Sequence, residues 1–221
     1  MGGLGLLSIL QHDPIVFFLL AAALVEAIAL HEFAHALAAD VQGDRLPRAL
    51  GRLTLNPARH LDPLGTLLIF LVGFGWGKPV EFRPDALASK RFGASLVALA
   101  GPMMNLVLAL AGGVALSLTC TVVGVARCAA PTGLLDVFIT FLEIFLGINV
   151  VLAVFNLIPL PPLDGSRLLT LFLPPSKQKI IFFLDRYGFI LLIAVVLLGG
   201  TRLIGPLIDF VHGSILRLVG A

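Results

Sequence analysis

Long apolar runs separated by short polar connections form most of this chain. A helix that crosses the hydrocarbon core of a bilayer needs about 20 apolar residues, because each residue adds about 1.5 Å of rise. Four segments are long enough: Pro14–Ala39, Leu96–Val125, Leu134–Ile158 and Ile180–Leu198. The pattern therefore predicts four main transmembrane helices.

Shorter apolar stretches predict further elements. Leu203–Val219 contains glycine, proline and charged residues, which favours a short or interfacial helix. Leu64–Phe74 is too short to span a bilayer, and Leu46–Leu55 and Lys78–Phe82 have a short strand-like pattern. We therefore expect an all-α membrane protein with four main transmembrane helices, a C-terminal short or interfacial helix, and a small β-strand or re-entrant element between spans one and two.

The composition agrees with a membrane protein. Of the 221 residues, 58% are hydrophobic and only 13% are charged, which is not typical of a soluble protein. The spans leave no room for a separate soluble domain, so we expect one polytopic membrane domain over residues 1–221. The net charge of +2 follows from the connections between spans, and we expect no nucleic-acid binding.

Cations gather in two of these connections. The connection between the first two spans contains Arg45, Arg48, Arg52, Arg59, Lys78, Arg83, Lys90 and Arg91. The connection after the third span adds Arg167, Lys177 and Lys179, whereas Thr119–Pro131 has only Arg127. By the positive-inside rule, the first and third connections lie in the cytoplasm and the N-terminus lies outside.

The two cysteines of the chain, Cys120 and Cys128, both fall in the connection predicted to lie outside. An oxidising compartment would permit a disulfide between them. Two apolar side chains near the end of a helix fit the sequence equally well, so the pattern leaves both alternatives open.

The first predicted span contains the sequence His31-Glu32-Phe33-Ala34-His35. On a helix the two histidines are four residues apart, so both imidazoles point the same way and can bind one metal ion. Glu32 can reach a water on that metal, which is the H-E-x-x-H arrangement of zinc peptidases with glutamate as general base. The alternative is a polar contact between helices without a metal.

An acidic side chain in the middle of a transmembrane helix costs about 2.5–3.5 kcal/mol on insertion scales. Glu32 and the two histidines therefore require a compensating metal, water or partner. A catalytic zinc site has three protein ligands and one open position, so a third ligand is needed.

Asp164 is the candidate for this third ligand. It follows a proline-rich segment at the end of the third span, Phe155–Gly165. Irregular backbone at membrane depth is tolerated where it lines a cavity or is buried in protein. At the cytoplasmic end of its span, Asp164 can face the histidine pair. Alternatively, it caps the helix that begins at Ser166.

Five segments in the same order resemble the short bacterial and archaeal branch of the site-2 proteases, which are intramembrane metalloproteases of peptidase family M50. They are Leu30–Ala36, Gly51–Gly65, Gly75–Val80, Ala100–Leu106 and Phe155–Gly165. The resemblance implies zinc bound by His31, His35 and Asp164, with Glu32 as base and a catalytic core over about residues 14–175. The PDZ-like and C-terminal regulatory segments of other branches are not recognised.

The same resemblance implies hydrolysis of peptide bonds in or near transmembrane segments of membrane-protein substrates, as regulated intramembrane proteolysis. It implies one Zn²⁺ per chain and a multi-pass protein of the prokaryotic inner membrane, embedded in the lipid bilayer with its active site toward the cytoplasm. An upstream protease that trims the substrate is a further possible partner. Asn105 is the candidate donor for the oxyanion, and a hydrogen bond between helices is its alternative role.

Two other functions use similar residues. A metal or ion transporter also places histidine and aspartate in the membrane, but it does not specially need Glu32 beside His31. A catalytically inactive adaptor is disfavoured by the intact Glu32. His60 fits either a pocket or a surface loop, and Glu26 in the first span has no assigned role. Asn149 and Asn156 share one helical face and are expected to pack against the site.

Overall fold

The computed structural model describes residues 6–72, 75–172, 178–199 and 201–220. These residues are mostly helical, and no strand forms within them. The helices are α1 (Leu6–His12), α2 (Pro14–Val41), α3 (Leu46–Ala49), α4 (Pro63–Val72), α5 (Lys90–Val123), α6 (Val125–Ala129), α7 (Leu134–Asn156), α8 (Gly165–Phe172), α9 (Gln178–Leu197) and α10 (Thr201–Val219), with short 3₁₀ turns at η1 (Pro57–Arg59) and η2 (Pro84–Ala86).

Three of the predicted spans are confirmed as helices that are long and apolar enough to cross a membrane: α2, α5 and α7. Helix α2 begins at Pro14 because the side chain of Asp13 accepts a hydrogen bond from the Val16 amide at 3.1 Å. The fourth predicted span, Ile180–Leu198, overlaps α9 over all but its last residue. In the described part of α9 the apolar stretch is the shorter Arg186–Val195, so a count of four spans is not confirmed.

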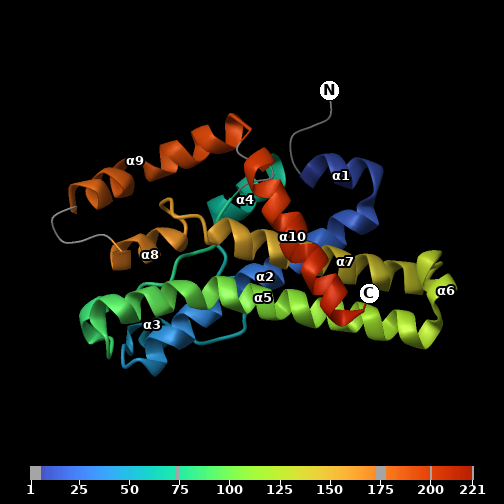
Figure 1. The fold of residues 1–221 in the computed structure, drawn as a ribbon, viewed down its shortest axis with the longest axis horizontal. Coiled ribbons are helices and arrows are strands. Elements are labelled where there is room, and N and C mark those ends of the chain that lie inside the picture. Colours follow the sequence, from blue (N-terminus) through green and yellow to red (C-terminus); the bar gives the residue numbers. More distant parts are fainter. Residues whose placement is uncertain (1–5, 73–74, 173–177, 200, 221) are drawn as a thin grey trace.

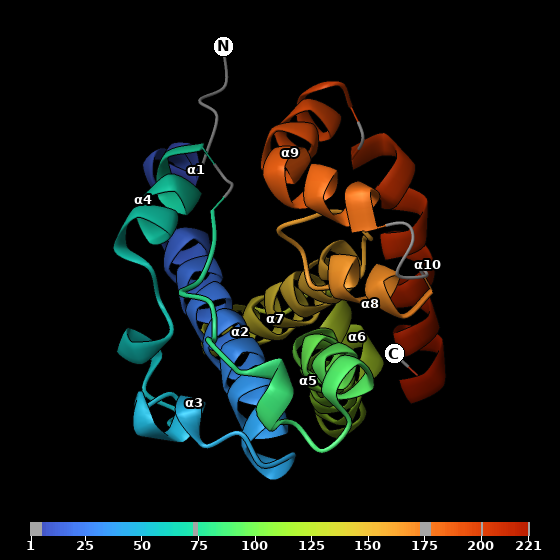
Figure 2. The same cartoon turned by 90° about the vertical axis from the view of Figure 1, so that its left-hand side faces the viewer.

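Helices α2, α5 and α7 pack against one another and form the centre of the molecule. Figure 2 shows α1 and α4 on one side of this group and α8, α9 and α10 on the other. Ala23, Ala27, Ala109 and Ala153 are fully buried. Small side chains let helix backbones approach closely, which is how apolar helices associate where water provides no driving force.

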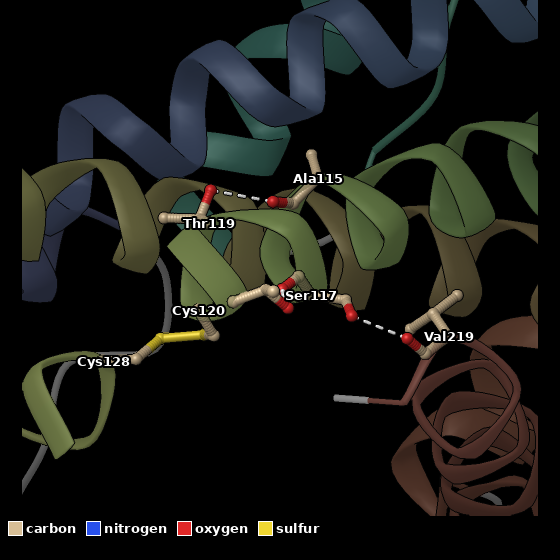
Figure 3. Close-up of a disulfide and its surroundings, with 7 residues drawn as sticks. Ala115, Ser117, Thr119, Cys120, Cys128 and Val219 are labelled. Carbon is tan, nitrogen blue, oxygen red and sulfur yellow. Dashed lines mark hydrogen bonds between the residues drawn. A yellow bond between two sulfur atoms is a disulfide. The ribbon is translucent and has the colours of Figure 1, made fainter. Parts of the chain in front are cut away.

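Helix α10 covers the stretch where the sequence predicts a short or interfacial helix. It is 19 residues long and, among the described residues, is not one of the helices long and apolar enough to cross a membrane. In Figure 1 it crosses over α5 and α7. Its apolar side chains, which include Ile204, Ile208 and Ile215, pack against a buried cluster around Leu146. The hydroxyl of Ser117 also donates a hydrogen bond to the carbonyl of Val219 at 2.6 Å (Figure 3).

The connection between α2 and α5 does not contain the predicted strands. Residues 46–49 form the short helix α3, which has a proline in its first turn, and Lys78–Phe82 forms no strand. The one pairing of strand type among the described residues is an antiparallel bridge between Leu61 and Gly77. Helix α4 has ten residues where a re-entrant element was predicted, and residues 73–74 lie outside the described part.

Two buried aspartates hold this connection to the end of α2. Asp40 accepts hydrogen bonds from Arg45 and Arg48, and Asp44 accepts hydrogen bonds from the side chain and the amide of Arg83. Burial by itself raises the pKa of Asp44, but the hydrogen bonds from Arg83 and Leu46 outweigh it and leave the pKa below its usual range. Much of the cationic charge therefore organises the connection itself.

Cys120 and Cys128 form a disulfide, which answers the question that the sequence left open. Figure 3 shows the bond between the end of α5 and α6, and Figure 1 shows α3 and α6 at opposite ends of α5. Gly124 makes the turn between the two helices with a φ of 88°, a conformation that suits glycine.

Candidate metal centre

The structure brings together the three residues that the sequence predicts as metal ligands. His31 and His35 lie one turn apart on α2, are both buried, and have their Nε2 atoms 3.0 Å apart. The Oδ2 atom of Asp164 lies 3.0 Å from Nε2 of His31 and 3.3 Å from Nε2 of His35. One ligand atom from each residue lies within 4.8 Å of the others.

Asp164 reaches the histidines because the chain turns back sharply after α7. The proline-rich segment ends the helix, and Gly165 lies directly against it. A Cβ on Gly165 would lie 2.3 Å from the carbonyl oxygen of Leu157, so only glycine fits there. At the start of α8, the backbone carbonyl of Asp164 accepts from the amide of Arg167 at 2.9 Å, and the hydroxyl of Ser166 donates to the carbonyl of Leu163. The side chain of Asp164 faces the histidines, with Oδ2 within 3.3 Å of both Nε2 atoms.

Both imidazole rings are oriented by hydrogen bonds on the side away from Asp164. Nδ1 of His31 lies 2.6 Å from Oδ1 of Asn105, and Nδ1 of His35 lies 2.7 Å from the carbonyl oxygen of Val97. Both oxygens are acceptors, so each Nδ1 carries the proton. The two Nε2 atoms are then left as ligand atoms, which is how metal-binding histidines are usually held.

Asn105 belongs to a buried polar network that joins the three central helices. Its Nδ2 donates to the carbonyl of Ala27 on α2 at 3.3 Å and to Oδ1 of Asn149 on α7 at 2.8 Å. Asn149 in turn donates to the carbonyl of Phe145. The amide of Asn105 is therefore occupied on both sides in this structure, and its role as an oxyanion donor stays a prediction.

The donor set fits a zinc ion, and the backbone beside it leaves room for one. A Cβ on Gly101 of α5 would lie 2.4 Å from Nε2 of His35 and 2.5 Å from Nε2 of His31. Any side chain at this position would therefore occupy the space in front of the ligand atoms. Two neutral imidazoles and one carboxylate match the ligands of catalytic zinc sites. The sequence places Gly101 in a motif but does not reveal this role.

The three ligands lie at a cavity of about 470 Å³. Its walls come from α2, α5, α7, the loop after α7, and residues 75–82, and α9 contributes Phe189 and Leu192. The cavity thus extends beyond the core predicted over about residues 14–175. Trp76 contacts Phe189 edge to face, with ring centroids 6.0 Å apart, so the connection and α9 meet at this cavity.

Glu32 lines the same cavity, next to the two histidines. Its Oε2 atom lies 3.8 Å from Nη2 of Arg52, a buried residue of the connection. In the sequence, Arg52 stands in the cationic connection and within the family-like segment Gly51–Gly65, but nothing in the local pattern indicates that it faces the site.

Three further residues that the sequence singles out, His60, Asn156 and Glu26, differ in their position relative to the cavity. His60 is fully buried, where a surface loop was the simpler alternative, and its Nε2 donates to the carbonyl of Thr54. Burial lowers the pKa of His60, which keeps its ring neutral. Asn156 lines the cavity, whereas Glu26 is exposed on α2 and outside the cavity lining.

Comparisons with known proteins agree with this site. The family model of peptidase family M50 matches residues 19–195. YwhC of Bacillus subtilis, named as a candidate zinc metalloprotease, is 39% identical over 90% of this chain and 89% of its own. Two proteins named Rip2 are also candidate zinc metalloproteases. The one from Mycolicibacterium smegmatis is 36% identical over 83% of this chain and 67% of its own. The one from Mycobacterium tuberculosis H37Rv is 30% identical over 82% of this chain and 68% of its own.

No solved structure matches the chain. The family match covers most of the chain, and the relatives agree over nearly the same length. The chain therefore belongs to peptidase family M50, and it is a zinc metalloprotease with three apolar helices long enough to cross a membrane.

Proposed function

We propose that this protein hydrolyses peptide bonds in or near the transmembrane segments of membrane-protein substrates, in the manner of regulated intramembrane proteolysis. The observation that carries the proposal is the convergence of His31, His35 and Asp164 at a cavity that Glu32 also lines, among helices apolar enough to span a membrane. A hydrolytic site at membrane depth suits a substrate that is itself held in the bilayer.

In this proposal His31, His35 and Asp164 hold the zinc. A bound zinc ion lowers the pKa of a coordinated water to about 7 and polarises a carbonyl. Glu32 accepts the proton of the attacking water and delivers it to the amine that leaves when the C–N bond breaks. Asn105 and the carbonyl of Val97 keep the two imidazoles in the orientation that ligation needs.

A transporter built on the same residues is the alternative function. Family membership does not favour it, and the placement of Glu32 at the cavity has no evident purpose in simple transport. We therefore keep hydrolysis as the proposed function.

Incubation of the purified protein with synthetic transmembrane peptides tests this function. We expect the peptides to be cut at defined bonds, and we expect a zinc chelator to stop the cutting and added Zn²⁺ to restore it. Mass spectrometry of the fragments locates the bond. Cleavage that continues in the presence of the chelator would contradict a zinc mechanism, and wild-type protein that cuts no peptide of a varied panel would contradict the proposed substrate class.

We further propose that the metal centre opens toward the cytoplasm of a bacterial cell. The connection that carries most of the cations begins at α3 and leads into the start of α5, and the disulfide lies at the opposite end of α5 (Figure 1). Cations favour the cytoplasmic side and disulfides favour an oxidising compartment, so the two observations support the same orientation. A cut at this depth would release a fragment into the cytoplasm, after trimming by an upstream protease where one is needed.

Labelling of thiols in intact cells with a membrane-impermeant maleimide tests the orientation. After reduction, we expect Cys120 and Cys128 to react from outside. Cysteines introduced at the exposed positions Arg59 and Lys78, in a variant that lacks the native pair, should react only after the membrane is permeabilised. Reaction at position 59 or 78 in intact cells, without reaction at Cys120 or Cys128, would show the inverted topology.

A further inference from the structure

Arg52 is buried in the connection between α2 and α5, with about 4% of its surface exposed. Its guanidinium donates to two backbone carbonyls, Nη1 to that of Arg59 and Nη2 to that of Lys78. These carbonyls belong to two segments that run side by side, since the amide of Lys78 donates to the carbonyl of His60 at 2.7 Å. Arg52 therefore joins the two segments of the connection that lie nearest the site.

The same guanidinium faces the carboxylate of Glu32. Nη2 of Arg52 lies 3.8 Å from Oε2 of Glu32, and both side chains are largely buried. Within the described residues, this Oε2 atom accepts no hydrogen bond. A buried carboxylate and a buried guanidinium each carry a large desolvation cost, which their mutual attraction offsets. Removing Arg52 would take from Oε2 of Glu32 the cation that faces it, and removing Glu32 would take from the guanidinium its buried carboxylate.

The second carboxylate oxygen of Glu32 lies in different surroundings. A Cβ on Gly77 would lie 3.4 Å from Oε1 of Glu32 and 2.8 Å from Cγ2 of Ile28, so the backbone at Gly77 lies close against α2. Glu32 and Gly77 both line the cavity, whereas Arg52 is not among its lining residues. The carboxylate thus has Arg52 beside Oε2 and the cavity wall at Gly77 beside Oε1.

We propose that Arg52 is a positioning residue for Glu32, which it holds through Oε2 so that Oε1 remains available at the cavity. This inference rests on the proposed function, in which Glu32 is the base. The planar guanidinium suits the task, because it bonds two carbonyls and still presents its charge to a carboxylate. A lysine ammonium is a single point charge and cannot reproduce all three contacts. Arg52 also couples the base to the wall that lines the cavity.

A double-mutant cycle on thermal unfolding tests the pairing without any substrate. The four zinc-loaded proteins are wild type, R52M, E32Q and the double variant E32Q/R52M, all in the same detergent. Breaking a buried pair leaves one charge unpaired, so we expect R52M to lower the melting temperature by about 5–10 °C. E32Q/R52M should lose less than the sum of the two single variants, because it no longer contains a carboxylate without its guanidinium. The loss that remains reports the two carbonyls that Arg52 no longer binds. Additive shifts would overturn the proposal.

Cleavage of a synthetic transmembrane peptide tests the positioning. We expect R52M to retain its zinc and its KM, and to lose about 10–100-fold in kcat, as is usual for residues that support a metal site from the second layer. The kcat of R52K should lie between those of R52M and wild type, because lysine restores the charge but not the planar guanidinium with its several donors. R59M is the matched control, since it removes an exposed cation from the same connection and leaves the carbonyl that Arg52 binds.

The outcomes separate this inference from the proposed function. R52M with the kcat of wild type, or an equal loss in R59M, would overturn the positioning role. If R52M does not fold, R52K is tested in its place. A wild-type kcat in R52K would then show that Glu32 does not need the planar guanidinium of Arg52. Unimpaired cleavage by E32Q would instead refute Glu32 as base, while the thermal cycle would still report whether the two charges are paired.

Discussion

Replacing His31, His35 or Asp164 by alanine is expected to remove both the bound zinc and all chelator-sensitive cleavage. Each change leaves two protein ligands where a catalytic zinc site needs three. Elemental analysis of the purified variants measures the metal, and peptide cleavage measures the activity. Asp164 is the most informative of the three, because it is 129 positions beyond His35 and is placed only by the fold. Stoichiometric zinc in Asp164→Ala would show that another residue is the third ligand.

A variant that keeps all three ligands provides a second test of the same site. Gly101→Ala adds one methyl group where a Cβ would lie about 2.4 Å from the ligand nitrogens. We expect it to lose zinc as completely as the ligand variants, although no donor atom has been removed. Gly147→Ala on α7 is the matched control, because nothing lies within 4 Å of its Cβ position. Normal zinc content in Gly101→Ala would mean that the metal binds elsewhere.

Local patterns were sufficient to predict the features that depend on a single helix. The apolar runs of α2, α5 and α7 exceed the length of a span, and the spacing of His31 and His35 places both on one helical face whatever surrounds the helix. Asp164 could be predicted as well, because prolines and a glycine at the end of a span indicate irregular backbone beside a cavity.

The predicted count of four spans is not confirmed, and the span at Ile180–Leu198 stays a prediction. Within the described residues, the apolar stretch of α9 is Arg186–Val195, which is shorter than a span. The strand prediction at Leu46–Leu55 was wrong at residues 46–49, since Pro47 favours the first turn of a helix over a strand.

Features that depend on how helices pack could not be read from the sequence. Asn105 contacts His31 across 74 positions, and Arg52 faces Glu32 only because the connection folds back onto α2. Gly101 matters because α5 approaches the ligand atoms closely, which no property of α5 alone predicts. His60 is buried because the connection folds back on itself: its Nε2 donates to the carbonyl of Thr54, and its own carbonyl accepts from the amide of Lys78.

Replacing Glu32 by glutamine is expected to abolish cleavage while zinc stays near one per chain. Glutamine keeps the shape of the side chain but cannot take a proton from the attacking water. Loss of general acid–base catalysis typically costs about 10²–10⁴-fold in rate. Zinc should remain because Glu32 is not one of the three residues whose ligand atoms converge. Peptide cleavage and elemental analysis of the same preparation measure both quantities.

The control for this variant is Glu26→Gln, which makes the same chemical change on the same helix. Glu26 is exposed and does not line the cavity, so we expect cleavage at the wild-type rate. A loss of cleavage in both variants would mean that the cause is the removal of negative charge from α2, and not the removal of a base from the site. A loss of zinc in Glu32→Gln would make Glu32 a ligand. Undiminished, chelator-sensitive cleavage by Glu32→Gln would require another base. Among the cavity-lining residues, the other carboxylate is that of Asp164, which already contacts the two histidines. The expected outcome thus separates the residue that moves the proton from the residues that hold the metal.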